Sequence, residues 1–101
     1  MNLNFSDSLK GLDGQPILDN GKEKLLNEVC INALGATHLN ERGQPENPPP
    51  MEKERRLALI RKIYLGGWID LAAEEIVLIK QMVDKSYGTL WSGLIKEMLE
   101  K

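Results

Sequence analysis

The sequence has few of the residues on which protein chemistry usually depends. Its 101 residues include one cysteine, Cys30, and one histidine, His38. A lone cysteine excludes an internal disulfide and a cysteine-based zinc site, and a lone histidine excludes a metal site built from two imidazoles. The sequence also lacks a glycine-rich phosphate loop of the G-x-G-x-x-G type. We therefore expect no metal site, no cofactor and no enzyme activity.

Long apolar runs and an excess of one charge are also missing. No apolar stretch approaches the roughly 20 residues that span a membrane. Residues 1–5 lack the basic and then apolar order of a signal peptide. With 13 basic and 15 acidic residues the formal charge is −2, whereas domains dedicated to nucleic acid are usually basic. We expect a soluble cytoplasmic protein with a single domain over residues 1–101.

Two dipeptides mark turns near the N-terminus. In Asp13-Gly14 and Asn20-Gly21 the glycine can adopt a positive φ without steric cost. We expect residues 1–21 to form a short β-hairpin arm that turns near Asp13-Gly14-Gln15. Asn20 would then cap the helix that follows.

Apolar residues at helical spacing predict four helices after this arm. The expected ranges are 22–35, 51–65, 71–85 and 89–100. The fold class is therefore mainly α, with the short N-terminal β-hairpin packed on a four-helix domain. We expect the helix over 71–85, capped by Asp70, to be the central one, because apolar residues cover much of its circumference.

Side-chain positions follow from the same spacing. In helix 51–65 we expect Leu57, Ile60, Ile63 and Tyr64 to be buried. The last helix has a clean apolar stripe, and the residues expected on it are Leu90, Trp91, Leu94, Ile95, Met98 and Leu99. This stripe either completes the core or, as the second choice, pairs across the axis of a homodimer. Ser92 would face away from it.

The segment between the first two helices is polar and rich in proline. Residues 37–50 predict a surface loop whose triple proline, residues 48–50, is stiff and extended. His38 lies in this loop, and we expect it to be exposed. Cys30, in contrast, lies on the apolar stripe of helix 22–35, where we expect a small core residue.

Charge is most concentrated on helix 51–65, which has five basic and two acidic residues. The candidate contact residues there are Arg55, Arg56, Arg61 and Lys62. A solvated helix face is the simplest interpretation, and contact with an acidic protein surface or with phosphates is the functional one. Phosphate contact would require these four side chains to share one face without nearby carboxylates.

Trp68 is the remaining candidate contact residue, because tryptophan is enriched at binding hot spots. It lies between Gly67 and Ile69 in what we expect to be an extended link. Large aromatic side chains are usually buried, so a core or lid position is favoured over an exposed anchor.

Four pieces follow one another along the chain: residues 9–17 (LKGLDGQPI), the proline-rich middle, residues 70–80 (DLAAEEIVLIK), and Ser86-Tyr87-Gly88 before an amphipathic last helix. Their order resembles a family of small proteins encoded by tailed phages and prophages. The resemblance implies a phage or prophage origin, and it gives no catalytic residues to carry over because the family has no assigned reaction. It is compatible with a role in virion assembly or with the modification of a host process.

These observations together favour a non-catalytic accessory protein that binds another protein, either a phage structural protein or a host protein. The alternative is a nucleic-acid-binding regulator that uses the basic helix 51–65.

Overall fold

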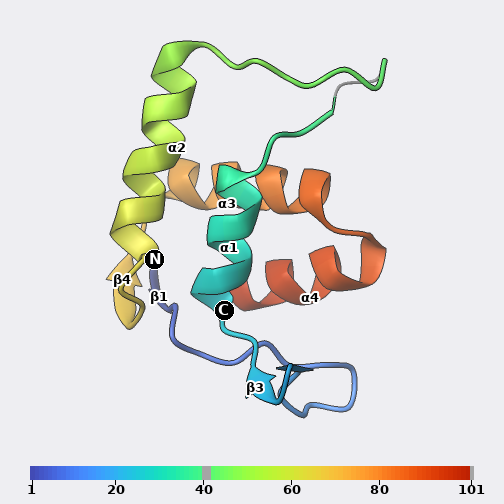
Figure 1. The fold of residues 1–101 in the computed structure, drawn as a ribbon. Coiled ribbons are helices and arrows are strands. Elements are labelled where there is room, and N and C mark those ends of the chain that lie inside the picture. Colours follow the sequence, from blue (N-terminus) through green and yellow to red (C-terminus); the bar gives the residue numbers. More distant parts are fainter. Residues whose placement is uncertain (40–41, 101) are drawn as a thin grey trace.

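The computed structural model describes residues 1–39 and 42–100, and within them it contains four helices and two small antiparallel sheets (Figure 1). The fold is mainly α with minor β, as the sequence predicts. The helices are α1 (Leu26–Gly35), α2 (Pro50–Ile63), α3 (Ala73–Ser86) and α4 (Thr89–Leu99).

Helix α1 is the central helix, because it packs against α2, α3 and α4 (Figure 1). Half of its residues are buried, and these are Leu26, Val29, Cys30, Ala33 and Leu34. The expectation that the helix over 71–85 is central was wrong. Helix α3 packs against α1 and α4, and its Val77 side chain is 52% exposed.

The first of the two glycine turns forms where the sequence predicts it. Gly14 has a φ of +78°. Lys10 and Pro16 form an antiparallel bridge, and the Ile17 N–H donates to the Leu9 carbonyl at 2.8 Å. The chain therefore doubles back around Asp13.

The second turn closes a separate hairpin instead of starting a helix. Strand β2 (Leu18–Asp19) pairs with β3 (Lys22–Glu23), and the two residues between them, Asn20 and Gly21, have φ values of +52° and +79°. Positive φ at both positions is typical of a type I′ hairpin turn, for which Asn-Gly is a preferred pair. Asn20 is therefore no helix cap, and α1 begins four residues later than the predicted start at residue 22.

A second sheet, which we did not predict, joins the two halves of the chain. Strand β1 (Asn2–Asn4) pairs antiparallel with β4 (Trp68–Asp70), and Leu3 lies opposite Ile69. The predicted extended link is thus an edge strand. Leu3 belongs to the hydrophobic core, and Ile69 is partly buried against it.

The start of α3 also differs from the expectation. The residue that precedes α3 is Ala72, and its N–H donates to the Glu75 carboxylate at 2.9 Å. Such a bond satisfies one backbone donor at a helix N-terminus. Asp70, the predicted cap, lies in β4 and contacts the Met1 amino group at 3.0 Å.

The buried side of α4 is shifted from the predicted one by about one residue. Ile95, Met98 and Leu99 are buried as expected, but Leu90 is 53% exposed. Ser92 is buried, not solvent-facing, because its hydroxyl donates to Asp84 on α3. Within the described residues, every helix is too short or too polar to cross a membrane.

Candidate functional site

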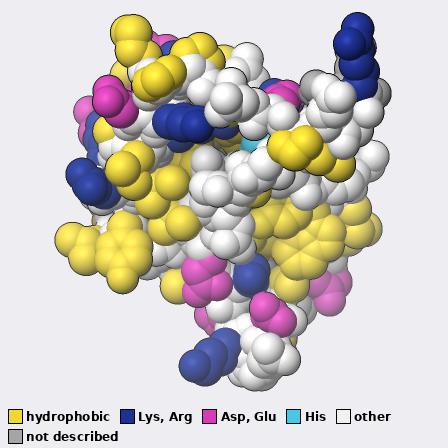
Figure 2. Space-filling view, turned by 45° about the horizontal axis from the view of Figure 1, so that its top comes forward, with side chains coloured by type: hydrophobic (Ala, Val, Ile, Leu, Met, Phe, Trp, Pro, Cys, Tyr) yellow, Lys and Arg dark blue, Asp and Glu magenta, His cyan; other side chains and the backbone are white. Residues whose placement is uncertain are grey.

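Apart from Met51 at the start of α2, four large hydrophobic side chains are exposed between the middle of α2 and the start of β4. Leu57 is 46% exposed, Tyr64 68%, Leu65 88% and Trp68 70%. We call these four residues the α2–β4 patch. Figure 2 shows hydrophobic side chains gathered at the left of the molecule, over the region of α2 and β4. Apolar side chains that gather on a surface are typical of interaction sites.

Two glycines create the turn that carries this patch. Gly66 and Gly67 have φ values of +73° and +77°, which end α2 and direct the chain into β4. The Gly67 N–H donates to the Ser6 hydroxyl at 2.7 Å. A Cβ atom on Gly66 would collide with that same hydroxyl. Only glycine therefore fits at position 66.

The register of the β1–β4 pair determines where Trp68 points. Successive side chains of a strand lie on opposite faces. Because Ile69 packs on the core, Trp68 faces solvent beside Asn4, its partner in the register. The predicted core or lid position of Trp68 was wrong, and the exposed alternative is correct.

The patch includes Tyr64 and Leu65, which sequence reasoning missed. Helix α2 buries Leu59 and Ile63, which lie four residues apart on one face. Leu57 and Tyr64 were predicted to be buried, but they are exposed and lie on a different face of the helix. Residues 57–60 are all apolar, and four consecutive positions span too much of a helix for one buried stripe. That crowding is the signal that indicated a second apolar face.

The basic residues of α2 do not form one cationic face. Arg56 and Arg61 lie five residues apart and therefore about 140° apart around the helix. Arg56 Nε donates to Glu52 at 3.3 Å, Arg55 lies 3.9 Å from the same carboxylate, and Lys62 Nζ lies 3.0 Å from Glu75. The arrangement that would favour phosphate contact, four cations on one face without carboxylates, is thus not found in α2.

The Lys62–Glu75 ion pair ties α2 to α3. Partial burial of Glu75 opposes its ionisation, but hydrogen bonds from the Ala72 N–H and from Lys62 outweigh this effect and lower its pKa. The side chains are 42% and 28% exposed, so the pair contributes about 1 kcal/mol or less.

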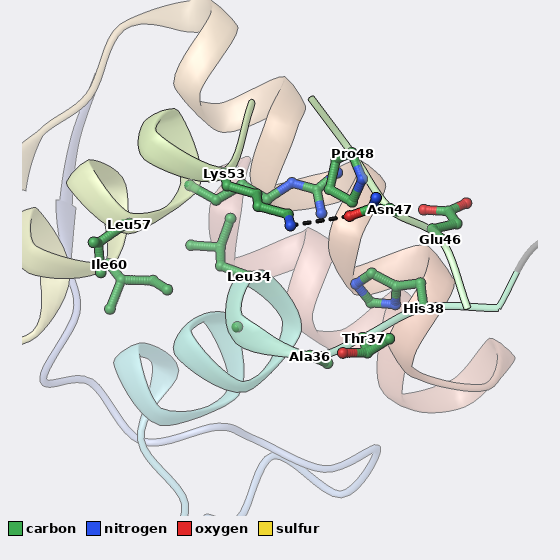
Figure 3. Close-up of a pocket in the computed structure, with 12 residues that line it drawn as sticks. Leu34, Ala36, Thr37, His38, Glu46, Asn47, Pro48, Lys53, Leu57 and Ile60 are labelled. Carbon is green, nitrogen blue, oxygen red and sulfur yellow. Dashed lines mark hydrogen bonds between the residues drawn. The ribbon is translucent and has the colours of Figure 1, made fainter. Parts of the chain in front are cut away.

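An open pocket of about 430 Å³ lies between the C-terminal end of α1, the loop that follows it and α2. We call it the α1–α2 pocket. Figure 3 shows Leu34, Leu57 and Ile60 on one side of it and the polar side chains of the loop on the other. Lys53 reaches across and donates to Asn47 Oδ1 at 3.0 Å.

His38 helps to build this pocket, and its predicted exposure was wrong. The imidazole is 6% exposed, and its Nε2 donates to the Ala33 carbonyl at 3.0 Å. The last carbonyl groups of a helix lack partners within the helix, which explains why a donor from the loop packs there. The Glu46 N–H in turn donates to the His38 carbonyl at 2.7 Å.

The predicted extended triple proline is found only in part, because the last of its three prolines belongs to α2. Pro49 has a φ of −57° and a ψ of 153°, close to the polyproline II conformation. Pro50 is the first residue of α2, a position where proline has no N–H to lose. Residues 40–41 of the predicted loop lie outside the described residues.

A second pocket of similar volume lies between the N-terminal arm and α4. Its aromatic wall consists of Tyr87 and Trp91, whose rings stack with centroids 6.3 Å apart. Leu18 lines it from β2. Trp91 is 36% exposed, so the last helix retains an apolar surface outside the core.

The pKa values of Cys30 and Asp84 are also shifted, and both shifts have structural causes. Burial raises the pKa of the Cys30 thiol to about 12, which fits the core position predicted for it. Hydrogen bonds from Ser92 and from Lys96 lower the pKa of Asp84. Among the described residues, no three His, Cys, Asp or Glu side chains are grouped as a metal site would require.

Comparison of the chain with protein-family models, with curated proteins and with solved structures gave no match.

Proposed function

We propose that this chain is a small, non-catalytic accessory protein of phage or prophage type that binds another protein in the cytoplasm of a bacterial host. Its partner is either a phage structural protein, whose assembly it assists, or a host protein, whose activity it modulates. The observation that carries the proposal is the α2–β4 patch, in which Tyr64, Leu65 and Trp68 are each more than two-thirds exposed.

The composition of the patch fits protein binding. Tyrosine and tryptophan dominate binding energies at interfaces because they bury a large area and lose few rotamers. Arg61 lies between Leu57 and Tyr64 in the sequence, and its side chain is exposed. Arginine next to aromatic anchors is a common composition of an interface. The contact residues expected from the sequence at this surface are therefore Arg61 and Trp68, joined by Leu57, Tyr64 and Leu65.

Affinity capture with matched variants tests the proposal. The bait is the full chain, and it is exposed to bacterial lysates with and without phage proteins. One variant combines Tyr64→Ser with Trp68→Ser. The control combines Leu12→Ser with Leu39→Ser, which removes two side chains that lie outside α2 and β4 and are 84% and 64% exposed. All four substitutions lie at the surface, so the free energy of unfolding should change by about 0.5 kcal/mol or less for each.

We expect the wild type and the control to recover the same protein, and the Tyr64/Trp68 variant to recover at least about tenfold less of it, since two hot-spot residues are lost. Equal recovery by both variants, or no recovery by any bait in either lysate, would contradict the proposal.

A further inference from the structure

The α1–α2 pocket lies beside the α2–β4 patch, and its side chains differ in chemistry from those of the patch. Its volume of about 430 Å³ lies within the range of roughly 300–1,000 Å³ that small ligands occupy. Leu34 and Ile60 form an apolar wall, and Leu57 belongs both to this wall and to the α2–β4 patch. The pocket and the patch are therefore continuous along α2.

The opposite side of the pocket carries a cation that no carboxylate neutralises within the described residues. Lys53 Nζ donates to the side-chain oxygen of Asn47 at 3.0 Å, and this acceptor is neutral. The other lining cation, Arg56, is already paired with Glu52. The amide nitrogen of Asn47 supplies two further N–H donors. Lys53 and Asn47 together thus offer a carboxylate both a positive charge and hydrogen bonds.

The third side of the pocket is the C-terminal end of α1. Gly35 and Ala36 line it, and α1 ends at Gly35. The last four carbonyl groups of a helix have no acceptor role inside the helix. One of them, the carbonyl of Ala33, already accepts a hydrogen bond from His38 Nε2. The carbonyl groups that follow in the chain are suited to accept an N–H from a ligand.

We propose that the α1–α2 pocket binds the C-terminal residue of a protein partner. The α-carboxylate of that residue contacts Lys53 and Asn47, its backbone N–H donates to a carbonyl at the end of α1, and its apolar side chain packs against Leu34, Leu57 and Ile60. This inference rests on the proposed function, because it names the part of the partner that enters the pocket.

The three sides of the pocket distinguish a peptide C-terminus from other anions. A fatty acid has a carboxylate and an apolar chain but no N–H for the end of α1. A phosphate group has neither an apolar part nor that N–H, and it carries more negative charge. Glu46 lines the pocket as well, but Lys85 Nζ lies 2.9 Å from its carboxylate and pairs with it. The pairing reduces the repulsion between Glu46 and a carboxylate ligand.

The spacing along α2 lets one partner reach both surfaces. Leu57 and Tyr64 are seven residues apart, or about 10 Å along a helix that rises 1.5 Å per residue. An extended chain covers that distance with about three residues. A partner that packs against Tyr64 and Trp68 can thus place its own C-terminus in the α1–α2 pocket.

Titration of the isotope-labelled full chain with short peptides, followed by NMR, tests the inference. The probe is N-acetyl-Ala-Leu with a carboxylate end, and the matched control is the same peptide as a C-terminal amide. Octanoate and inorganic phosphate are the other two ligands. We expect saturable shifts at residues 34–36, 53, 57 and 60, with a dissociation constant on the order of 1 mM for so small a ligand. The amide should bind at least about tenfold more weakly, since it loses the charged hydrogen bonds.

Lys53→Met provides the matching protein variant, and Lys22→Met, in the exposed β3 strand, is its control. We expect Lys53→Met to weaken binding of the carboxylate peptide about tenfold and Lys22→Met to leave its binding unchanged. Equal binding of acid and amide, tighter binding of octanoate or phosphate, or no effect of Lys53→Met would overturn the inference. A partner that is captured through Tyr64 and Trp68 but is insensitive to Lys53→Met would leave the proposed function intact and reject only this inference.

Discussion

Helices α2 and α3 are both 14 residues long, yet they have opposite roles in the fold. Five large apolar side chains of α3 are buried, and these are Ile76, Leu78, Ile79, Met82 and Val83. In α2, by contrast, only Leu59 and Ile63 are buried. The comparison shows that a narrow buried stripe holds α2 in place, whereas Leu57 on the helix and Tyr64 directly after it are exposed. We therefore interpret α3 as a core helix and α2 as the helix that presents contacts.

The largest expected effect is a difference in stability between variants of the two helices. Ile79→Ala in α3 removes a side chain that is fully buried, and we expect it to lower the free energy of unfolding by about 2–5 kcal/mol. Tyr64→Ala, directly after the last residue of α2, should change it by about 0.5 kcal/mol or less, because the ring is 68% exposed. Urea denaturation of both variants measures the difference. Similar losses would show that α2 is a core helix after all.

The turn after α2 gives the next largest effect. Gly66→Ala places a Cβ against Ser6 at a φ of +73°, and we expect a loss of about 1–2 kcal/mol or more. Gly93→Ala is the control, since Gly93 lies inside α4 with open space around it. That change should stabilise the protein by about 0.5–1 kcal/mol. Thermal unfolding measures both variants, and a shift of their midpoint temperatures in the same direction would contradict this account of the turn.

The ion pair between α2 and α3 predicts a smaller, pH-dependent effect. The pKa of Glu75 is lower in the folded protein than its ordinary value of 4.5. Its contribution to stability is therefore complete above pH 4.5 and is lost as the pH falls through the folded pKa. Glu75→Gln should lower the free energy of unfolding by about 1 kcal/mol or less at pH 7. It should also reduce the loss of stability that the wild type shows below pH 4.5. Urea denaturation across this range would contradict the account if wild type and variant declined in parallel.

The smallest expected effect concerns self-association through α4. Trp91 is 36% exposed, whereas Tyr64 and Trp68 on the α2–β4 patch are about twice as exposed. We expect sedimentation at tens of micromolar to give the monomer mass of 11.4 kDa. Trp91→Ser should leave that mass unchanged. A dimer that Trp91→Ser dissociates would make α4, not α2, the main contact surface.

Local patterns predicted most of the fold. The four helices and the turn at Asp13-Gly14 follow from apolar spacing and from glycine, both of which act over a few residues. The pairing of β1 with β4 was not predictable in the same way, because each strand has three residues and they lie more than 60 residues apart. Asn20-Gly21 is compatible with a helix start or with a hairpin turn. Pairing between residues 18–19 and 22–23 decides in favour of the turn.

The candidate site was predicted less well than the fold. Arg61 and Trp68 were named from the sequence, but the positions of Tyr64 and Leu65 depend on which face of α2 packs against α1. His38 was misplaced for a related reason, since its burial depends on a carbonyl at the end of another element, Ala33. Such contacts arise from tertiary packing and leave no local pattern in the sequence.

Site-specific photo-crosslinking tests the central claim most directly. A p-benzoylphenylalanine residue replaces Tyr64, at the C-terminal end of α2, in one variant and Gln81, an exposed residue of α3, in the other. Each variant is irradiated in the lysate from which the wild type recovers its partner. If α2 presents the contacts, position 64 gives a covalent product with that partner and position 81 gives none. A product from position 81 alone, or equal products from both, would contradict the assignment of α2 as the binding helix.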